Sequence, residues 1–457
     1  MRKNLRPIAS ILLGVAFLLA GNGLQFTLLP LRGHAEGFSA FEIGGIGSAY
    51  YAGFVGGCLL APHIILRAGH IRAFAALVAL AVVVGLAYPL ANAVWPWIAF
   101  RLVNGFCIAG FYLVIESWLN DRASNEARGF VMSSYVMVIY VAFTAGQMMV
   151  TLYPIKGAED FMLAAMLASL AIVPVALTRS AQPAPITIVS FRPWQVYQAA
   201  PVGLVASMAI GAINGAFFGL APVSAARTGL DVAEVAVFMS AATLAGAATQ
   251  WPAGRLSDRF DRRIVLLVLL VGTTVSGLLL WLFADTGVLL VGFGFVYGAL
   301  ALPGYAVAAA HAYDKTPLSE MVSTAATVLL ANAVGAAIGP LIAPLVMDEL
   351  GPRSLFLFNA VVAAALAGYV LHRTRVQPTL APLQKTEFDL AATAPVGAMV
   401  TSETPDLDDP LVVVPEPYPP PPEPEMPAAE APPVEISAAD VEVLPPDDEP
   451  PPADRPA

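Results

Sequence analysis

Two charged residues in one long apolar segment are the first candidates for chemistry in this sequence. Arg101 and Glu116 lie 15 residues apart, which is ~22 Å along a helix at 1.5 Å per residue, so they cannot pair. Arg101 lies away from the ends of its segment. Because a charge at the centre of a bilayer costs about 2.5–3.5 kcal/mol on insertion scales, Arg101 should face protein or water.

Each of these residues has a functional and a structural interpretation. Arg101 could be a fixed positive group in a central cavity, where it would hold an anionic part of a substrate or favour the ionised form of a proton carrier. The alternative is an arginine that snorkels to the nearer membrane surface, and we favour the cavity. Glu116 could be a proton carrier or a lock at the inner end of its helix, with Arg122 or Arg128 in reach. The alternative for Glu116 is a solvated acid at a helix end.

Uncharged polar residues also interrupt the apolar segments. For each residue alone, a hydrogen bond between helices, worth ~0.6 kcal/mol on average, is a sufficient explanation. As a set, they predict a cavity that is rich in neutral hydrogen-bonding groups and has one positive charge. The residues are Asn22, Gln25, Tyr50, Tyr51, Tyr112, Gln147, Asn214, Tyr297 and Asn332.

The composition excludes several classes of protein. The 457 residues are 58% apolar and 12% charged, whereas soluble domains are about 45–50% apolar and about 25% charged. We therefore expect neither an ordinary soluble enzyme nor a nucleic-acid-binding protein. The sequence has no GxxxxGK[ST], HExxH or GxSxG motif, and Cys58 and Cys107 lie in apolar runs. We expect no ATP site, no cofactor, no metal site and no enzyme activity.

Twelve apolar segments in residues 1–375 are long enough to cross a bilayer as helices, which takes ~20 residues each. We predict an all-α membrane protein with two six-helix bundles, 1–178 and 199–375, and a central cytoplasmic loop, 179–198. A signal peptide is disfavoured, because the first apolar run is too long and another follows at once. The predicted spans are 7–31, 41–66, 73–93, 96–119, 129–152, 161–178, 199–224, 233–253, 264–284, 287–312, 320–347 and 355–372.

Lys and Arg are unevenly distributed over the connections between these spans. With the N-terminus inside, the inner segments hold sixteen Lys and Arg and the outer loops hold four. The positive-inside rule therefore predicts that both termini are cytoplasmic, in a bacterial inner (plasma) membrane. The outer four are Arg32, Lys156, Arg227 and Arg353.

The two halves of this body repeat with an offset of 192 residues. Residues 20–30 read AGNGLQFTLLP and residues 212–222 read AINGAFFGLAP, with six of the eleven positions identical. Asn22 and Asn214 are the paired polar residues of this repeat. A parallel repeat of six helices predicts two similar bundles related by an axis along the membrane normal.

The repeat continues into a second pattern that concerns two acidic residues. Ser39 and Glu42 align with Asp231 and Glu234, and each pair has the spacing of a capping box at the start of an apolar helix. Glu42 and Glu234 could also be read as proton carriers. We favour capping, because the spacing explains both partners.

The last part of the chain, 376–457, differs from the body. It holds 17 of the 33 Asp and Glu and 21 of the 39 prolines. Proline at this density favours extended conformations, and the acidic residues repel one another. We predict a disordered cytoplasmic tail and consider a docking motif the weaker alternative.

Three short motifs resemble those of the major facilitator superfamily. The loop GRLSDRFDRR, 254–263, is similar to the family's G-x-L-x-D-R-x-G-R-R signature, and Asp261 departs from it where the family has glycine. RLVNG, 101–105, resembles the R-x-x-x-G motif of proton-linked members. GAAIGP, 335–340, resembles a glycine-proline pattern that antiporters more often carry in the fifth span. The resemblance covers residues ~1–375.

The resemblance implies a gate and a function. Asp258 would lock the two bundles against the start of the eleventh span, near Ser319, where a helix dipole favours an anion. The alternative is that the loop arginines only mark the cytoplasmic side. The other gate residues would be Gly254, Arg259, Arg262 and Arg263.

The function that follows is secondary active transport of a small organic solute by alternating access. We expect coupling to protons and favour export over uptake. A membrane scaffold or sensor that signals through the tail is the alternative from another class, and a membrane-embedded enzyme is a weaker one.

Overall fold

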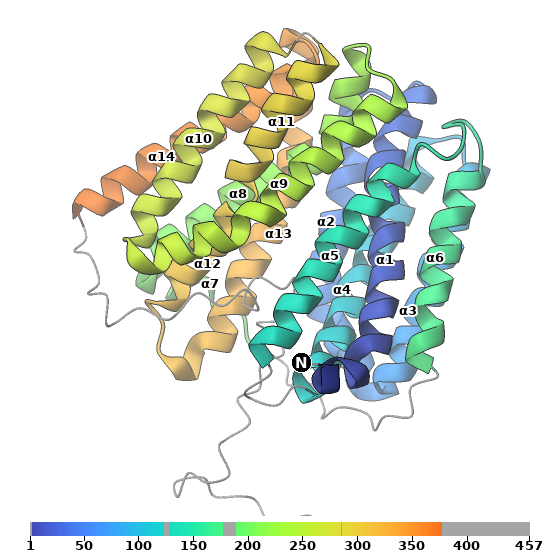
Figure 1. Ribbon diagram of the computed structural model, residues 1–457, viewed down its shortest axis with the longest axis horizontal. Coiled ribbons are helices and arrows are strands. Elements are labelled where there is room, and N and C mark those ends of the chain that lie inside the picture. The colour runs from blue at the N-terminus through green and yellow to red at the C-terminus, as the bar shows by residue number, and fades with distance from the viewer. Residues whose placement is uncertain (1, 123–127, 177–188, 285, 377–457) are drawn as a thin grey trace, which may run out of the picture. The chain divides into compact units, whose positions relative to one another are not determined.

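The computed structural model describes residues 2–122, 128–176, 189–284 and 286–376 (Figure 1). The predicted tail beyond Val376 and the first half of the central loop, 179–188, lie outside these residues. The helices of the first half are α1 (Arg2–Ala35), α2 (Ala40–Ala68), α3 (His70–Ala87), α4 (Val94–Arg122), α5 (Arg128–Met149) and α6 (Glu159–Ala176). Those of the second half are α8 (Pro201–Arg227), α9 (Val232–Arg259), α10 (Arg262–Phe283), α11 (Gly287–Ala301), α12 (Gly304–Tyr313), α13 (Met321–Leu350) and α14 (Ser354–Val376).

The described residues are helical, contain no strand, and include eleven helices that are long and apolar enough to cross a membrane. Each of the eleven corresponds to a predicted span. The sixth predicted span, 161–178, ends beyond the last described residue of α6, so the count of twelve stays a prediction. A short helix, α7 (Pro193–Ala199), precedes the second half.

One predicted boundary was wrong, and one predicted span has an internal break that was not foreseen. The third span was expected to reach residue 93, but α3 ends at Ala87 and a 3₁₀ turn containing Pro89 follows. The tenth span, 287–312, is divided into α11 and α12 at Pro303. Proline has no backbone N–H, so it removes one hydrogen bond from a helix and can kink or end it.

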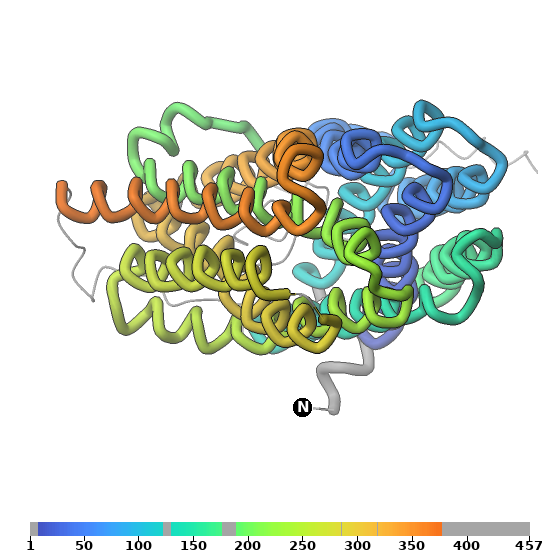
Figure 2. Tube along the Cα trace, turned by 90° about the horizontal axis from the view of Figure 1, so that it is seen from above, coloured from blue at the N-terminus to red at the C-terminus, as the bar shows by residue number. Residues whose placement is uncertain are grey.

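The two halves use the same helix pairs. In the first half, α1 packs on α5 and α6, and α2 packs on α4. In the second half, α8 packs on α13 and α14, and α9 packs on α11. Seen from above, the helices of each half form a group of their own (Figure 2). The helix pairing therefore repeats as the 192-residue offset predicts.

The close packing of these pairs depends on glycine at matched positions. A side chain on Gly23 of α1 would collide with the backbone carbonyl of Phe143 on α5. Gly215, 192 residues later, faces the carbonyl of Ala336 on α13 in the same way. Small residues let helix backbones approach closely in a membrane, where packing drives association.

The predicted capping boxes at the starts of α2 and α9 are confirmed. The Ser39 hydroxyl accepts a hydrogen bond from the Glu42 backbone N–H, and the Glu42 carboxylate accepts one from the Ser39 N–H at 2.8 Å. Asp231 and Glu234 repeat this arrangement at 2.8 and 3.0 Å. Capping therefore accounts for both acidic residues.

Contacts between the halves are made mainly by α2 with α13 and by α5 with α9. Under the repeat, α2 corresponds to α9 and α13 to α5, so these two contacts are equivalent. In addition, α1 and α2 pack on α8. The face at which α1 begins and α14 ends is called the terminal face below.

Candidate functional site

Arg101 lies in the protein interior and not at a surface. Its side chain projects from α4 and is only 3% exposed. One guanidinium nitrogen, Nη1, donates to Gln25 Oε1 on α1 at 3.3 Å and to Asn104 Oδ1 at 3.2 Å. The snorkelling interpretation is therefore wrong, because an arginine at the surface would direct its charge into water.

Two aromatic rings cover the Arg101 guanidinium. Its central carbon lies 4.5 Å from the centroid of the Phe26 ring and 4.4 Å from that of Tyr50. The two rings meet edge to face at 4.8 Å. A guanidinium over an aromatic face is attracted by the ring quadrupole, by about 2 kcal/mol or more where water is excluded.

No carboxylate of the described residues lies within 4.0 Å of Arg101. Ion pairs among these residues, such as that of Arg262 with Asp314, join other groups. The positive charge is thus held by two amide oxygens and two ring faces. This arrangement lowers the cost of burying the charge, which pairs with no carboxylate in the described part of the chain.

Phe26 also marks the place where the two halves meet. Its ring lies 6.1 Å from that of Phe218 on α8, and the two residues are 192 positions apart, so they are equivalent in the repeat. Equivalent residues that touch each other must lie close to the axis that relates the halves. Phe143 of α5 packs against both rings, at 5.5 and 5.9 Å. Arg101 is therefore one aromatic layer from the axis.

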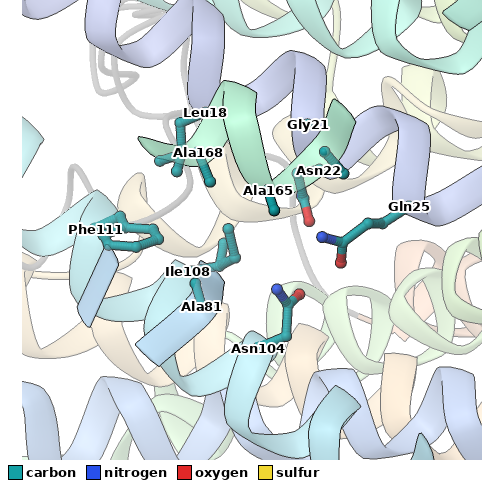
Figure 3. A pocket seen from close by; sticks show the side chains of 11 residues that line it. Leu18, Gly21, Asn22, Gln25, Ala81, Asn104, Ile108, Phe111, Ala165 and Ala168 are labelled. Carbon is teal, nitrogen blue, oxygen red and sulfur yellow. The ribbon is translucent and has the colours of Figure 1, made fainter. Parts of the chain in front are cut away.

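A small pocket adjoins Arg101 inside the first half. Asn22, Gln25 and Asn104 form its polar part, and their amide groups point toward one another (Figure 3). Asn22 Nδ2 lies 3.4 Å from the Tyr50 hydroxyl, while Asn22 Oδ1 is buried and has no hydrogen-bond partner in the part of the chain that the structure describes. The pocket has room for about one water molecule. Its remaining lining is Leu18, Gly21, Ala81, Ile108, Phe111, Ala164, Ala165 and Ala168.

The other predicted polar residues do not join this cluster. Asn332 donates to the backbone oxygen of Ser207 at 3.0 Å, which ties α13 to α8. Tyr297 accepts from Asn359 at 2.8 Å, which ties α11 to α14. For these two residues the interhelical hydrogen bond is a sufficient explanation.

The remaining predicted polar residues lie elsewhere in the two halves, and two of them, Gln147 and Tyr112, are buried. Gln147 on α5 is fully buried, and neither polar atom of its amide has a hydrogen-bond partner among the described residues. The side-chain oxygen of Asn214 on α8 is buried and accepts no hydrogen bond from a described residue. Tyr112 lies in the interior of the first half, with its ring 6.3 Å from that of Phe54. Tyr51 stacks edge to face on Tyr50 at 5.2 Å.

Glu116 is fully buried, so the interpretation as a solvated acid is wrong. The Tyr135 hydroxyl on α5 donates to its Oε1 at 2.8 Å. The side chains of Arg122 and Arg128 lie outside the described part of the chain. A buried carboxylate in a membrane segment is a default candidate for a proton site.

The loop between α9 and α10 forms a network of ion pairs at the terminal face. Arg262 binds Asp314 through two hydrogen bonds, at 2.6 and 3.2 Å, and lies 3.4 Å from Asp258. These partners of Arg262 all belong to the second half. Gly254 and Arg259 lie in the last two turns of α9, and Ser319 lies in the short turn Leu318–Glu320 before α13. The predicted lock between Asp258 and this turn stays a prediction.

Asp261, which departs from the family signature, has a local role. Its carboxylate caps α10 by accepting from the Arg263 backbone N–H at 2.9 Å, and it pairs with the Arg263 guanidinium at 2.8 Å. Burial acts to raise the pKa of Asp261, but the hydrogen bonds and the charge of Arg263 outweigh it and hold the pKa below its usual range.

Sequence reasoning missed several residues at the interface. Phe26, Phe143 and Phe218 surround the axis, and the Tyr140 hydroxyl of α5 donates to Gln250 Oε1 of α9 across the halves at 2.5 Å. The identical phenylalanine in both repeat segments was an available signal for Phe26 and Phe218. Nothing in the spacing pairs Tyr140 with Gln250.

The fold and this site define a membrane protein of two repeated helical halves with a polar cluster beside their axis. A sequence profile described as Major Facilitator Superfamily matches residues 202–414, and one described as Sugar (and other) transporter matches residues 14–180. An MFS-type transporter of Enterobacter sp. (strain 638) is 28% identical over 378 residues, which are 82% of this chain and 97% of that protein. The MFS-type transporter YcaD of Escherichia coli is 28% identical over 362 residues, 78% of this chain and 93% of that protein.

Solved structures agree with these matches at the level of the fold. The nucleoside transporter NupG superposes with a TM-score of 0.68 at 14% identity, over 80% of this chain and 98% of that one. A bacterial homologue of the human lysosomal transporter Spinster superposes with a TM-score of 0.64 at 13% identity, over 83% and 97% of the two chains.

The chain belongs to the major facilitator superfamily. It is a multi-pass inner-membrane protein that transports a small solute and is not an enzyme.

Proposed function

We propose that the protein is a proton-coupled secondary transporter that exports a small organic solute by alternating access. The observation that carries this proposal is the buried Arg101 beside the Phe26–Phe218 contact. A polar group next to the axis can be reached from either side as the two halves rock about it. Export is favoured over uptake because the loop 254–263 resembles the family signature that is most regular in exporters.

Two buried ionisable groups support coupling to protons. Glu116 is fully buried in a membrane segment and accepts a hydrogen bond from Tyr135, and an ionisable group in such a place is a default candidate for a proton site. Arg101 supplies a fixed charge ~22 Å away along the same helix. In this scheme Glu116 carries the proton and Arg101 lies on the solute pathway, with the amides of Asn22, Gln25 and Asn104 around it.

The experiment is solute flux in proteoliposomes with an imposed pH gradient, using a solute found by a ligand-stabilisation screen. We expect gradient-driven flux in the wild type, partial flux in Arg101→Lys and none in Arg101→Gln. Lysine keeps the charge but lacks the planar fork of arginine. Full gradient-driven flux in Arg101→Gln would reject the role of Arg101. Measurements on vesicles that hold the protein in each of its two orientations would distinguish export from uptake.

A scaffold or sensor that acts through residues 377–457 is the second candidate. It is motivated by the acidic, proline-rich composition of that segment. A chain that ends after Val376 should retain full flux if transport is the function. A signalling phenotype that needs the segment, with no flux in either form, would favour the scaffold.

We also propose that both termini are cytoplasmic, because Lys and Arg are concentrated in the predicted inner segments. A reporter fused after Arg375 would test this.

A further inference from the structure

The edge of the Arg101 guanidinium formed by Nε and Nη2 indicates which class of solute the protein binds. Both hydrogen bonds of this group, to Gln25 and Asn104, come from Nη1. Nε and Nη2 donate to no described residue. The N–H groups on this edge are parallel, and this geometry matches the two oxygens of one carboxylate.

The charge around this edge favours an anion. No described carboxylate lies within 4.0 Å of Arg101, and the side chain is 97% enclosed. A buried cation without a counter-ion is costly, and an arriving anion recovers part of that cost. The nearest polar groups, the Gln25 and Asn104 amides, already accept from the guanidinium and so do not compete for its free edge.

The surroundings of the charge are aromatic. Phe26 and Tyr50 lie against the guanidinium, and Phe143 and Phe218 continue the apolar surface to the axis between the halves. Phe218 belongs to the second half, so a molecule that reaches from Arg101 to the axis touches both halves. Such a molecule has one charged end and an apolar body.

We propose that the solute is an organic monocarboxylate whose carboxylate binds the Nε–Nη2 edge of Arg101 and whose apolar body packs on Phe26, Phe143 and Phe218. This inference rests on the proposed transport function and specifies its substrate class. A free inorganic anion has the same charge but no body to use the aromatic surface. The proposal therefore predicts selectivity for carboxylates with an aromatic or aliphatic body.

The test compares each carboxylate with its own neutral isostere on the purified protein in detergent. The probes are phenylacetate, benzoate and hexanoate, each beside its primary amide, with chloride and phosphate as inorganic anions. We expect a saturable rise in melting temperature with at least one carboxylate and about tenfold or more weaker binding of its amide. Equal binding of carboxylates and amides, or saturation by chloride or phosphate alone, would overturn the proposal.

Substitutions of Arg101 test whether the carboxylate binds at this residue. Arg101→Gln should abolish the stabilisation by the carboxylate, and Arg101→Lys should retain it with about tenfold or more weaker binding. Arg255→Gln is the matched control, because Arg255 also stacks on an aromatic ring, Trp251 at 4.0 Å, but is exposed. The comparison of carboxylate with amide on the wild type remains decisive if Arg101→Gln fails to fold. Carboxylate binding unchanged in folded Arg101→Gln would contradict the assignment.

Flux measurements separate this inference from the proposed function. Carboxylate binding that depends on Arg101, without flux of that carboxylate, would count against transport and leave the binding site intact. Gradient-driven flux of a neutral or cationic solute, without carboxylate binding, would overturn the inference and leave transport intact.

Discussion

At the scale of single residues, the two charges of α4 have different environments and therefore different expected roles. Arg101 is in contact with aromatic rings and amide oxygens near the axis. Glu116 is enclosed farther along the helix and accepts a hydrogen bond from Tyr135. A fixed charge suits recognition, because arginine does not lose its proton in proteins, whereas a buried carboxylate can bind and release one.

Replacement of Glu116 by glutamine tests the role of a proton carrier. Glutamine keeps the shape and can still accept from Tyr135, but it cannot be ionised. We expect Glu116→Gln to lose flux driven by a pH gradient and to keep exchange of labelled solute across the membrane at equal pH. Tyr135→Phe is the control, because it removes the hydrogen bond and keeps the carboxylate. Undiminished gradient-driven flux in Glu116→Gln would remove Glu116 from the coupling mechanism.

At the scale of helices, the position of Arg101 depends on how closely α2 and α4 approach. Gly105, one turn after Arg101, faces the backbone carbonyl of Tyr50, and a methyl group there would collide with it. Gly105→Ala should therefore separate α2 from α4 and cost about 1–3 kcal/mol of stability.

A second glycine provides the control. Gly56 on α2 has no neighbouring atom within 4 Å of an added side chain. Gly56→Ala should be neutral or stabilising by about 0.5–1 kcal/mol, since alanine favours helix over glycine. Melting temperatures in detergent measure both variants. Equal effects of the two substitutions would mean that the α2–α4 contact does not limit stability.

The cap of α10 gives a prediction about pH. The pKa of Asp261 is lowered in the folded state. The ionised carboxylate therefore stabilises the folded protein at neutral pH, and this stabilisation is lost as the pH falls through the folded-state pKa. Asp261→Ala should cost about 1 kcal/mol, the usual value of an N-cap. The difference from the wild type should persist from pH 7 down to about pH 4, near the usual Asp value of ~3.9. A melting-temperature difference that has vanished by about pH 5 would contradict the lowered pKa.

The positions of the membrane helices are the part of this fold that the sequence predicts best. Apolar length identifies membrane segments because lipid requires every backbone group to be bonded within its own helix. Capping boxes are local, so Ser39 and Asp231 were identified from spacing alone. The break at Pro303 was missed because the apolar run continues through it. The aromatic cover of Arg101 was missed because Phe26 and Tyr50 come from other helices, and no spacing rule connects them to α4.

At the scale of the whole molecule, the contacts between halves are placed at different depths. Near the face opposite the terminal face, Gly44 at the start of α2 packs on Pro340 and Pro344 of α13. Nearer the terminal face, Tyr140 of α5 binds Gln250 of α9. Alternating access requires that contacts at the two depths open in turn. The Tyr140–Gln250 bond is therefore expected to break when the terminal face opens.

Two substitutions should weaken closure of the terminal face. Tyr140→Phe removes a hydrogen bond between the halves, and Asp258→Asn removes a charge from the network that ends α9. Loss of a hydrogen bond of this kind shifts an equilibrium by about 0.5–1.5 kcal/mol, or up to about tenfold. Both variants should insert and fold normally, because neither change creates a cavity in the core of a bundle.

Cysteine labelling measures this shift. Cys58 and Cys107 are buried and would first be replaced by serine. A single cysteine is then placed at Ala333 of α13, a position 5% exposed and packed among residues of the first half. A membrane-permeant maleimide should label it faster, by up to about tenfold, in both variants, because more molecules have the terminal face open. Tyr297→Phe is the control, since its hydrogen bond to Asn359 lies within the second half. Labelling that is unchanged in Asp258→Asn but faster in Tyr140→Phe would assign the gate to the α5–α9 contact and leave Asp258 a structural partner of Arg262.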